Sequence, residues 1–183
     1  MVVFLTGLSG AGKSTIAEAL ADDLERDRVP VDIIDGDYLR AILTSDLGFD
    51  RASREENVRR AAMLAADSAR DGGVIVTALI APFESTRQWA REYVTAKRFP
   101  FLLVWIRTPL AVAEARDPKG LYRKARAGEI PDFTGIDSPY EEPSDADLVI
   151  DTTALSVPEA VAEIRRAIDS AQDQPSSSSP PSP

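Results

Sequence analysis

A run of small residues near the start of the chain has the composition of a phosphate-binding loop. It matches the pattern Gly-x-x-x-x-Gly-Lys-Ser/Thr, whose last two positions are Lys13 and Ser14. Glycines let consecutive backbone N–H groups face phosphate oxygens, and the following helix adds partial positive charge at its amino terminus. We therefore expect Lys13 to reach the β- and γ-phosphates of ATP and the Ser14 hydroxyl to ligate Mg²⁺. The predicted ATP-binding residues are Gly7, Leu8, Ser9, Gly10, Ala11, Gly12, Lys13, Ser14 and Thr15.

Two carboxylates, Asp35 and Asp37, follow the second predicted strand. The carboxyl ends of parallel strands line the ligand crevice of an open sheet, so this pair shares a rim with the phosphate loop. The chain has no histidine or cysteine, which leaves a carboxylate as the first choice for a general base. Asp35 could accept the proton of an attacking hydroxyl, with Asp37 positioning Mg²⁺ or the acceptor. The alternative is a simple turn, or an N-cap formed by Asp37.

Arginines are concentrated after this pair, at positions 40, 54, 59 and 60. Guanidinium groups suit sulfate and phosphate oxygens, but arginines on an amphipathic helix usually form a solvated face. We expect one or two of the four to bind an anion.

A second basic segment lies later in the chain. Residues 116–126 hold five positive charges, although the net charge of the chain is −9. A solvated helix would explain them. A lid over nucleotide phosphates also explains the length of the segment, about 116–143, which has no clean period.

Short β-branched runs alternate with helical patterns along the chain. Strands are predicted at 2–5, 31–34, 74–79, 101–106 and 148–150, and helices at 13–26, 38–43, 54–70, 84–97, 109–115 and 158–168. This alternation predicts an α/β fold: a three-layer P-loop NTPase-type domain with a parallel five-stranded sheet, helices on both faces and a basic lid. The domain should span 1–172, followed by a disordered Ser/Pro-rich tail at 173–183.

Composition narrows the choice of partners and location. Hydrophobic residues make up 44%, and no apolar run approaches the roughly 20 residues of a membrane span. The net negative charge argues against nucleic acid as a binding partner, because nucleic acid binding relies on a broad basic surface. No basic leader precedes the first strand, so we expect a cytoplasmic protein. The guanine-reading tetrapeptide Asn-Lys-x-Asp of GTPases is absent from the sequence, which favours a metabolite kinase.

The motifs together resemble the adenylylsulfate kinase family. The resemblance is carried, in the order of the family, by residues 7–15, 35–40, 46–49, 54–60, 117–130 and 132–140. The last two stretches are more specific than the phosphate loop, because no general nucleotide-binding argument requires them.

The resemblance implies ATP-dependent phosphorylation of the 3′-hydroxyl of adenosine 5′-phosphosulfate (APS), giving 3′-phosphoadenosine 5′-phosphosulfate and ADP. Asp35 would be the base and Lys13 the second catalytic residue. Phe49 and Phe133 would enclose the adenine of APS, although without the resemblance they would be ordinary core residues. A homodimer is usual for the family, and an association with a sulfurylase is left open. The implied substrate-binding residues are Asp35, Asp37, Arg40, Phe49, Arg54, Asn57, Ile80, Lys119 and Phe133.

Three of the departures from the family pattern bear on the choice of acceptor. Ala81 stands where serine is common, Glu84 where arginine is frequent, and Tyr38 where asparagine is usual. Without the serine no phosphoserine can form at position 81, so we expect direct in-line transfer. Two alternatives stay open: a paralogous kinase acting on another nucleotide or a small alcohol, and a non-catalytic nucleotide-binding module. Against the second, Asp35 and Lys13 are both present.

Overall fold

The computed structural model describes residues 1–69 and 73–172; the predicted tail at 173–183 lies outside the described residues. Five parallel strands form one sheet in the order β2-β3-β1-β4-β5, which confirms the predicted sheet. β1 lies at the centre, so the loop that follows it opens at the middle of the sheet. The strands are β1 (Val2–Thr6), β2 (Val31–Asp35), β3 (Val74–Ala78), β4 (Phe101–Arg107) and β5 (Leu148–Asp151).

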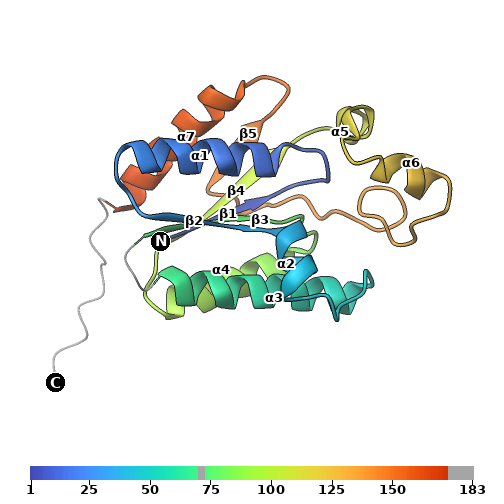
Figure 1. Ribbon diagram of the computed structural model, residues 1–183, viewed down its shortest axis with the longest axis horizontal. Coiled ribbons are helices and arrows are strands. Elements are labelled where there is room, and N and C mark those ends of the chain that lie inside the picture. Colours follow the sequence, from blue (N-terminus) through green and yellow to red (C-terminus); the bar gives the residue numbers. More distant parts are fainter. Residues whose placement is uncertain (70–72, 173–183) are drawn as a thin grey trace.

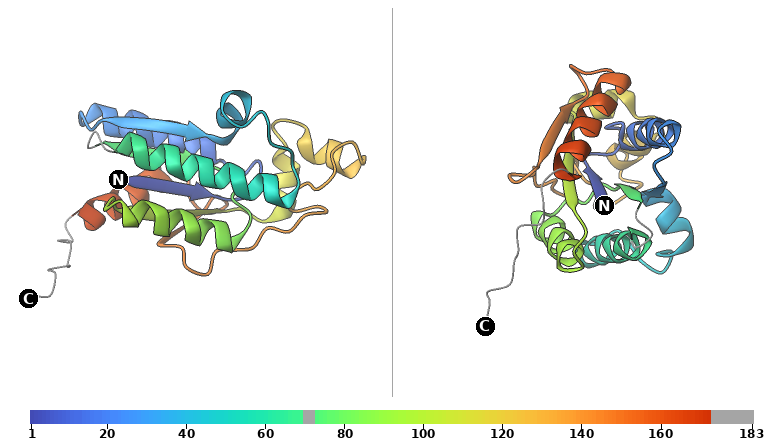
Figure 2. Two further views of the ribbon diagram at one scale, coloured as in Figure 1. Left: turned by 90° about the horizontal axis from the view of Figure 1, so that it is seen from below. Right: turned by 90° about the vertical axis from the view of Figure 1, so that its left-hand side faces the viewer.

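Helices cover both faces of the sheet. α1 and α7 lie on one face and α3 and α4 on the other, which gives the predicted three layers (Figure 1). α5 and α6 lie beyond the carboxyl ends of the strands (Figure 2). None of the helices in the described ranges is long and apolar enough to cross a membrane. The helices are α1 (Lys13–Arg26), α2 (Gly36–Ile42), α3 (Arg51–Ser68), α4 (Glu84–Ala96), α5 (Leu110–Arg116), α6 (Leu121–Arg126) and α7 (Val157–Gln172).

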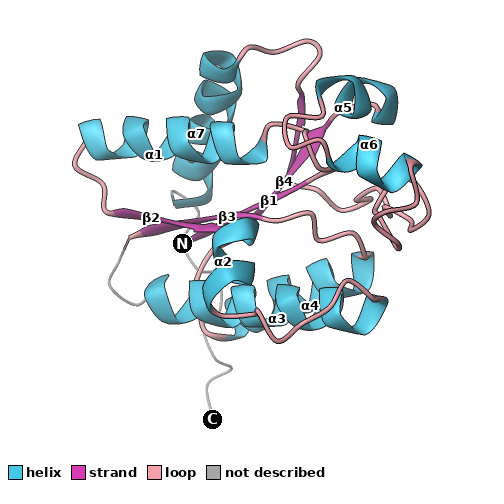
Figure 3. Cartoon of the chain, turned by 45° about the vertical axis from the view of Figure 1, so that its right-hand side comes forward, coloured by secondary structure: helices cyan, strands magenta, loops and turns pink. Residues whose placement is uncertain are grey.

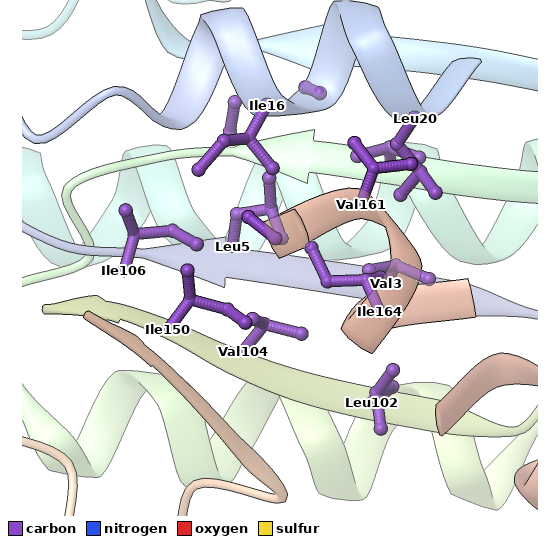
Figure 4. Packing of buried hydrophobic residues seen from close by; sticks show 14 of the residues in the cluster. Val3, Leu5, Ile16, Leu20, Leu102, Val104, Ile106, Ile150, Val161 and Ile164 are labelled. Atoms are coloured by element: carbon purple, nitrogen blue, oxygen red, sulfur yellow. The ribbon is translucent and has the colours of Figure 1, made fainter. Parts of the chain in front are cut away.

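The core has two halves because side chains alternate along each strand. Val3 and Leu5 of β1 pack under α1 and α7, beside Ile16 and Ile164 (Figure 4). The other side of β1 faces α3, whose buried positions there are mostly alanines. Small side chains let this helix approach the sheet closely. The strand that carries the phosphate loop is thus held firmly from both faces.

Three helices differ from the sequence prediction by more than two residues: α3, α6, and α7, which ends at Gln172 and not at 168. α3 begins at Arg51, three residues before the predicted start, because the Asp50 carboxylate caps it by accepting the N–H of Ser53 at 3.0 Å. α6 was not among the predicted helices, and a helix in this segment was only the alternative to a lid. Its six residues are too few to show a period, and its N-cap residue, Gly120, has no side chain. The Asp117 carboxylate, three residues earlier, accepts the N–H of Tyr122 at 3.0 Å instead. The rest of the predicted lid is largely loop (Figure 3).

Candidate active site

The phosphate loop connects the buried strand β1 to α1. Its glycines are required by geometry at two positions. A Cβ on Gly7 would lie 2.5 Å from the carbonyl oxygen of Ile106, and Gly12 caps α1 with a φ of 100°. The loop therefore brings its backbone to the carboxyl end of the sheet in the conformation that phosphate binding needs.

Lys13 begins α1 and is buried at the floor of the loop. Its ammonium donates to the carbonyl oxygens of Gly7 at 3.0 Å and Leu8 at 2.8 Å. Burial lowers the pKa of Lys13 to about 8, an effect opposed in part by the carboxylates of Asp35 and Asp37. The side chain is still mostly charged at neutral pH, and its hydrogen bonds hold the ammonium beside the loop backbone.

Asp35 joins the phosphate loop to the end of β2. One carboxylate oxygen accepts the Ser14 hydroxyl at 2.6 Å, and the other accepts the N–H of Asp37 at 2.8 Å. Asp35 is thus the N-cap of α2, a role that the structural alternative had assigned to Asp37. The carboxylate of Asp37 instead pairs with Lys119 of the lid segment. Asp35 therefore has a structural contact and also lies next to the phosphate loop.

A cavity of about 810 Å³ extends from this junction. All of the predicted substrate-binding residues line it, whereas Gly7, Leu8 and Ala11 of the phosphate loop do not. From the phosphate loop it is lined by Ser9, Gly10, Gly12, Lys13, Ser14 and Thr15, and from elsewhere by Asp35, Asp37, Arg40, Phe49, Arg54, Asn57, Ile80, Arg116, Lys119 and Phe133, among others. Segments that are distant in the sequence thus meet around one space.

Of the four clustered arginines, two line this cavity and two do not. The Arg40 guanidinium lies 4.5 Å from the ring centre of Phe49. Arg54 is buried, and donates to Thr134 Oγ1 at 2.7 Å and to the carbonyl oxygen of Asp132. Arg54 therefore connects α3 to the lid segment and leaves guanidinium N–H groups for a ligand.

The other two arginines lie outside the cavity lining. Arg60 forms an ion pair with Asp46 at 2.8 Å, and Arg59 contacts Glu55 at 3.8 Å on its own helix. Arg59 and Arg60 therefore belong to a solvated helix face, which was the alternative to an anion-binding role. Asn57, on the same helix, does line the cavity and accepts the Thr44 hydroxyl at 2.7 Å, which fixes the orientation of its amide.

The two phenylalanines of the cavity have different surroundings. Phe49, on the loop before α3, is 54% exposed, so it is not a core residue. Phe133 is 7% exposed and packs edge-on against Tyr122, with ring centres 5.0 Å apart. Phe133 is therefore a core residue of the lid segment that also presents surface to the cavity.

Tyr122 is a residue that the sequence analysis missed. Its hydroxyl donates to the carbonyl oxygen of Ser9 at 3.0 Å and so fastens α6 to the phosphate loop. Burial raises the pKa of Tyr122 to about 12, so the hydroxyl remains a donor. The available signal was the single aromatic residue within the charged stretch 116–126. Of those charges, Arg116 and Lys119 line the cavity, whereas Arg126 pairs with Glu114 at 2.8 Å.

Sequence comparison with known proteins identifies the family of the chain. The family model described as adenylylsulphate kinase matches residues 1–151. The chain belongs to the adenylylsulphate kinase family. Within it, the adenylyl-sulfate kinase of Bacillus pumilus is 50% identical over 155 residues, which are 85% of this chain and 78% of that relative. The adenylyl-sulfate kinase of Geotalea uraniireducens is 47% identical over 169 residues, covering 92% of this chain and 80% of the relative.

A solved structure of the adenylylsulphate kinase family has the same fold. The APS kinase of Mycobacterium tuberculosis, solved in complex with AMPPNP and APS, superposes with a TM-score of 0.90 at 41% identity. The match covers 92% of this chain and 96% of that chain. The overall fold of the chain is therefore similar to that of this APS kinase.

Proposed function

We propose that the chain transfers the γ-phosphoryl group of ATP to the 3′-hydroxyl of APS, forming ADP and 3′-phosphoadenosine 5′-phosphosulfate. The observation that supports this most directly is the 2.6 Å hydrogen bond between Ser14 and Asp35. This bond supports the proposal because the Asp35 carboxylate, our candidate base, lies next to the phosphate loop. The cavity next to this pair is lined by the residues that the acceptor would contact.

The reaction follows from the positions of these groups. The loop N–H groups and Lys13 bind the phosphates of ATP and stabilise the charge that develops on them. The 3′-oxygen attacks the γ-phosphorus, its proton passes to Asp35, and the bond from phosphorus to the β,γ-bridging oxygen breaks. Ala81 offers no nucleophile, so transfer through this position is excluded and direct in-line displacement is expected.

Mg²⁺ fits the chemistry of the junction. No group of three or more His, Cys, Asp or Glu residues that could hold a metal occurs in the described part of the chain. Ser14 Oγ is a hard oxygen ligand at this junction, and Mg²⁺ in kinases is usually held by one or two protein oxygens and the phosphates. When bound, Mg²⁺ would neutralise charge on the β- and γ-phosphates.

The acceptor would occupy the part of the cavity remote from the phosphate loop. Arg40, Arg54 and Asn57 would hold the phosphosulfate and ribose, because guanidinium groups match tetrahedral oxyanions. Phe49 and Phe133 would enclose the adenine.

Of the three departures from the family pattern that could indicate another acceptor, two lie outside the lining of the cavity. Glu84 accepts the Ser144 hydroxyl at 2.6 Å, and Tyr38 is 61% exposed. Neither lines the cavity, whereas Ala81 does. No contact of Glu84 or Tyr38 therefore favours a different substrate.

An acceptor panel tests the proposal. ADP release would be measured with MgATP and APS, and separately with AMP, adenosine and simple alcohols. We expect kcat/KM for APS to exceed that for each other acceptor by about 100-fold or more, because only APS engages the arginines and both aromatic rings. The Lys13→Ala variant is the control for contaminating kinases. Preference for another acceptor, or no turnover with any of them, would contradict the proposal.

The homodimer implied by the family and an association with a sulfurylase stay predictions. Light scattering of the purified chain, with and without a sulfurylase added, would test both.

A further inference from the structure

Arg87 is a buried cation without a carboxylate partner. It lies in the first turn of α4, is 0% exposed, and forms no ion pair among the described residues. Its two terminal nitrogens donate to the carbonyl oxygens of Ala81 and Glu141, each at 2.7 Å. The guanidinium also lies 5.9 Å from the ring centre of Tyr140. Burying a charge is costly, so its use to join two backbone carbonyls indicates that their relative position matters.

One of these carbonyls belongs to a strained turn. Ala81 has a φ of 42°, in the left-handed region that disfavours residues with a Cβ. The turn is buried and lies between β3 and α4, and with Ile80 it forms part of the cavity wall. Surrounding contacts must therefore maintain its conformation.

A second side chain, Thr6, also binds the same turn. The Thr6 hydroxyl, at the end of β1, donates to the carbonyl oxygen of Ile80 at 2.6 Å. Its only proton is used there, so the 3.1 Å contact with Tyr140 has the Tyr140 hydroxyl as donor. Thr6 thus connects the turn to the phosphate-loop strand and to the end of the lid segment.

The lid segment is fastened to the same place through Glu141. Its N–H donates to the carbonyl oxygen of Pro82 at 2.8 Å, and its carboxylate accepts the N–H of Glu84 at 2.7 Å. Arg87 accordingly lies where the turn, the start of α4 and the end of the lid segment meet. The wall of the cavity and the lid segment cannot move independently while these bonds persist.

We propose that Arg87 and Thr6 are positioning residues that hold the Ile80–Ala81 turn as a wall of the acceptor subsite. Neither lines the cavity, so both act through the turn. The proposal rests on the proposed function, because it assigns the turn to the acceptor and not to ATP. It predicts that loosening the turn weakens acceptor binding while ATP binding stays unchanged.

Arg87→Lys tests the role of the guanidinium. An ammonium keeps the charge but lacks the planar fork that reaches two carbonyls. We expect KM for APS to rise about tenfold and KM for ATP to change less than about twofold. Adding Ala81→Gly to Arg87→Lys should lower the raised KM for APS by about threefold, because glycine adopts a positive φ without strain.

Thr6→Val tests the same turn without altering a charge. It removes one hydroxyl with little change in shape, and we expect the same selective rise in KM for APS. If Arg87→Lys fails to fold, Thr6→Val decides alone. Arg91→Lys is the matched control, because Arg91 lies one turn along α4 and pairs with Asp147 at 3.0 Å away from the cavity.

Wild-type turnover of APS is measured first, and its absence would refute the proposed function and not this inference in particular. With wild-type activity present, equal rises in both KM values, or no rise in either variant, would overturn the positioning role. A rise in KM for APS in Arg91→Lys as large as that in Arg87→Lys would also overturn it.

Discussion

The two halves of the cavity are built in different ways. The phosphate half consists of consecutive residues after β1, and its shape comes from backbone conformation at Gly7 and Gly12. The acceptor half is assembled by side chains that bond to segments far along the chain: 80 residues away for Arg54 with Thr134, and 134 for Thr6 with Tyr140. We infer that substitutions in the first half impair all turnover, whereas substitutions in the second half change acceptor affinity selectively.

Asp35 lies where the two halves meet, and its removal should have the largest effect. Asparagine is an equally good N-cap, so Asp35→Asn keeps the contact with the N–H of Asp37 but cannot take a proton. We expect kcat to fall by about 100-fold or more, as is typical for loss of a general base, with little change in melting temperature.

Asp35→Ala separates the two roles of this residue. It should lose activity to a similar degree and also lower the unfolding free energy by about 1 kcal/mol, because the cap is removed. Steady-state kinetics and thermal melts of both variants would check this. A near-wild-type kcat in Asp35→Asn would remove Asp35 as the base and leave it only as a cap.

The two phenylalanines allow the acceptor half to be divided further. Stacking of a base on an aromatic ring is worth about 2 kcal/mol, so Phe49→Ala and Phe133→Ala should each raise KM for APS about 30-fold. Phe133 is packed against Tyr122 and Phe49 is exposed. Only Phe133→Ala should therefore also destabilise the fold, by about 3 kcal/mol.

Kinetics with ATP and thermal melts of these two variants provide the controls. KM for ATP should stay constant in Phe49→Ala. If Phe49→Ala left KM for APS unchanged, this ring would have no part in the acceptor subsite.

The same contrast explains how much could be predicted from the sequence. The sheet, its helices and the phosphate loop follow from local periodicity and one motif. The dual role of Asp35, as neighbour of Ser14 and cap of α2, could not be read from residue types, because both contacts need coordinates. Tyr122 and Arg87 were not assigned roles, because each acts through a backbone carbonyl of a distant segment, and carbonyls have no signature in a sequence.

The phosphate half should show its own pH dependence. Burial lowers the pKa of Lys13 to about 8, so the ammonium loses its proton as pH rises through this value. We expect kcat/KM for ATP to fall above pH 8, by about tenfold at pH 9 relative to pH 7. Lys13→Arg should have low activity without this decline, because a guanidinium stays charged. A wild-type profile that is flat to pH 9.5 would show that Lys13 is not desolvated.

The smallest expected effect concerns the charges of the lid segment. Lys119 lines the cavity and pairs with Asp37, whereas Arg126 pairs with Glu114 outside the lining. Both pairs are largely exposed, so neither contributes much to stability.

Lys119→Gln should lower kcat/KM for APS about fivefold, equivalent to about 1 kcal/mol, because a charge facing bound anions is lost. Arg126→Gln removes the same charge but should change kcat/KM less than about twofold. Kinetics at low and high salt would check the comparison, and equal losses in the two variants would mean that overall lid charge, and not the position of Lys119, sets affinity.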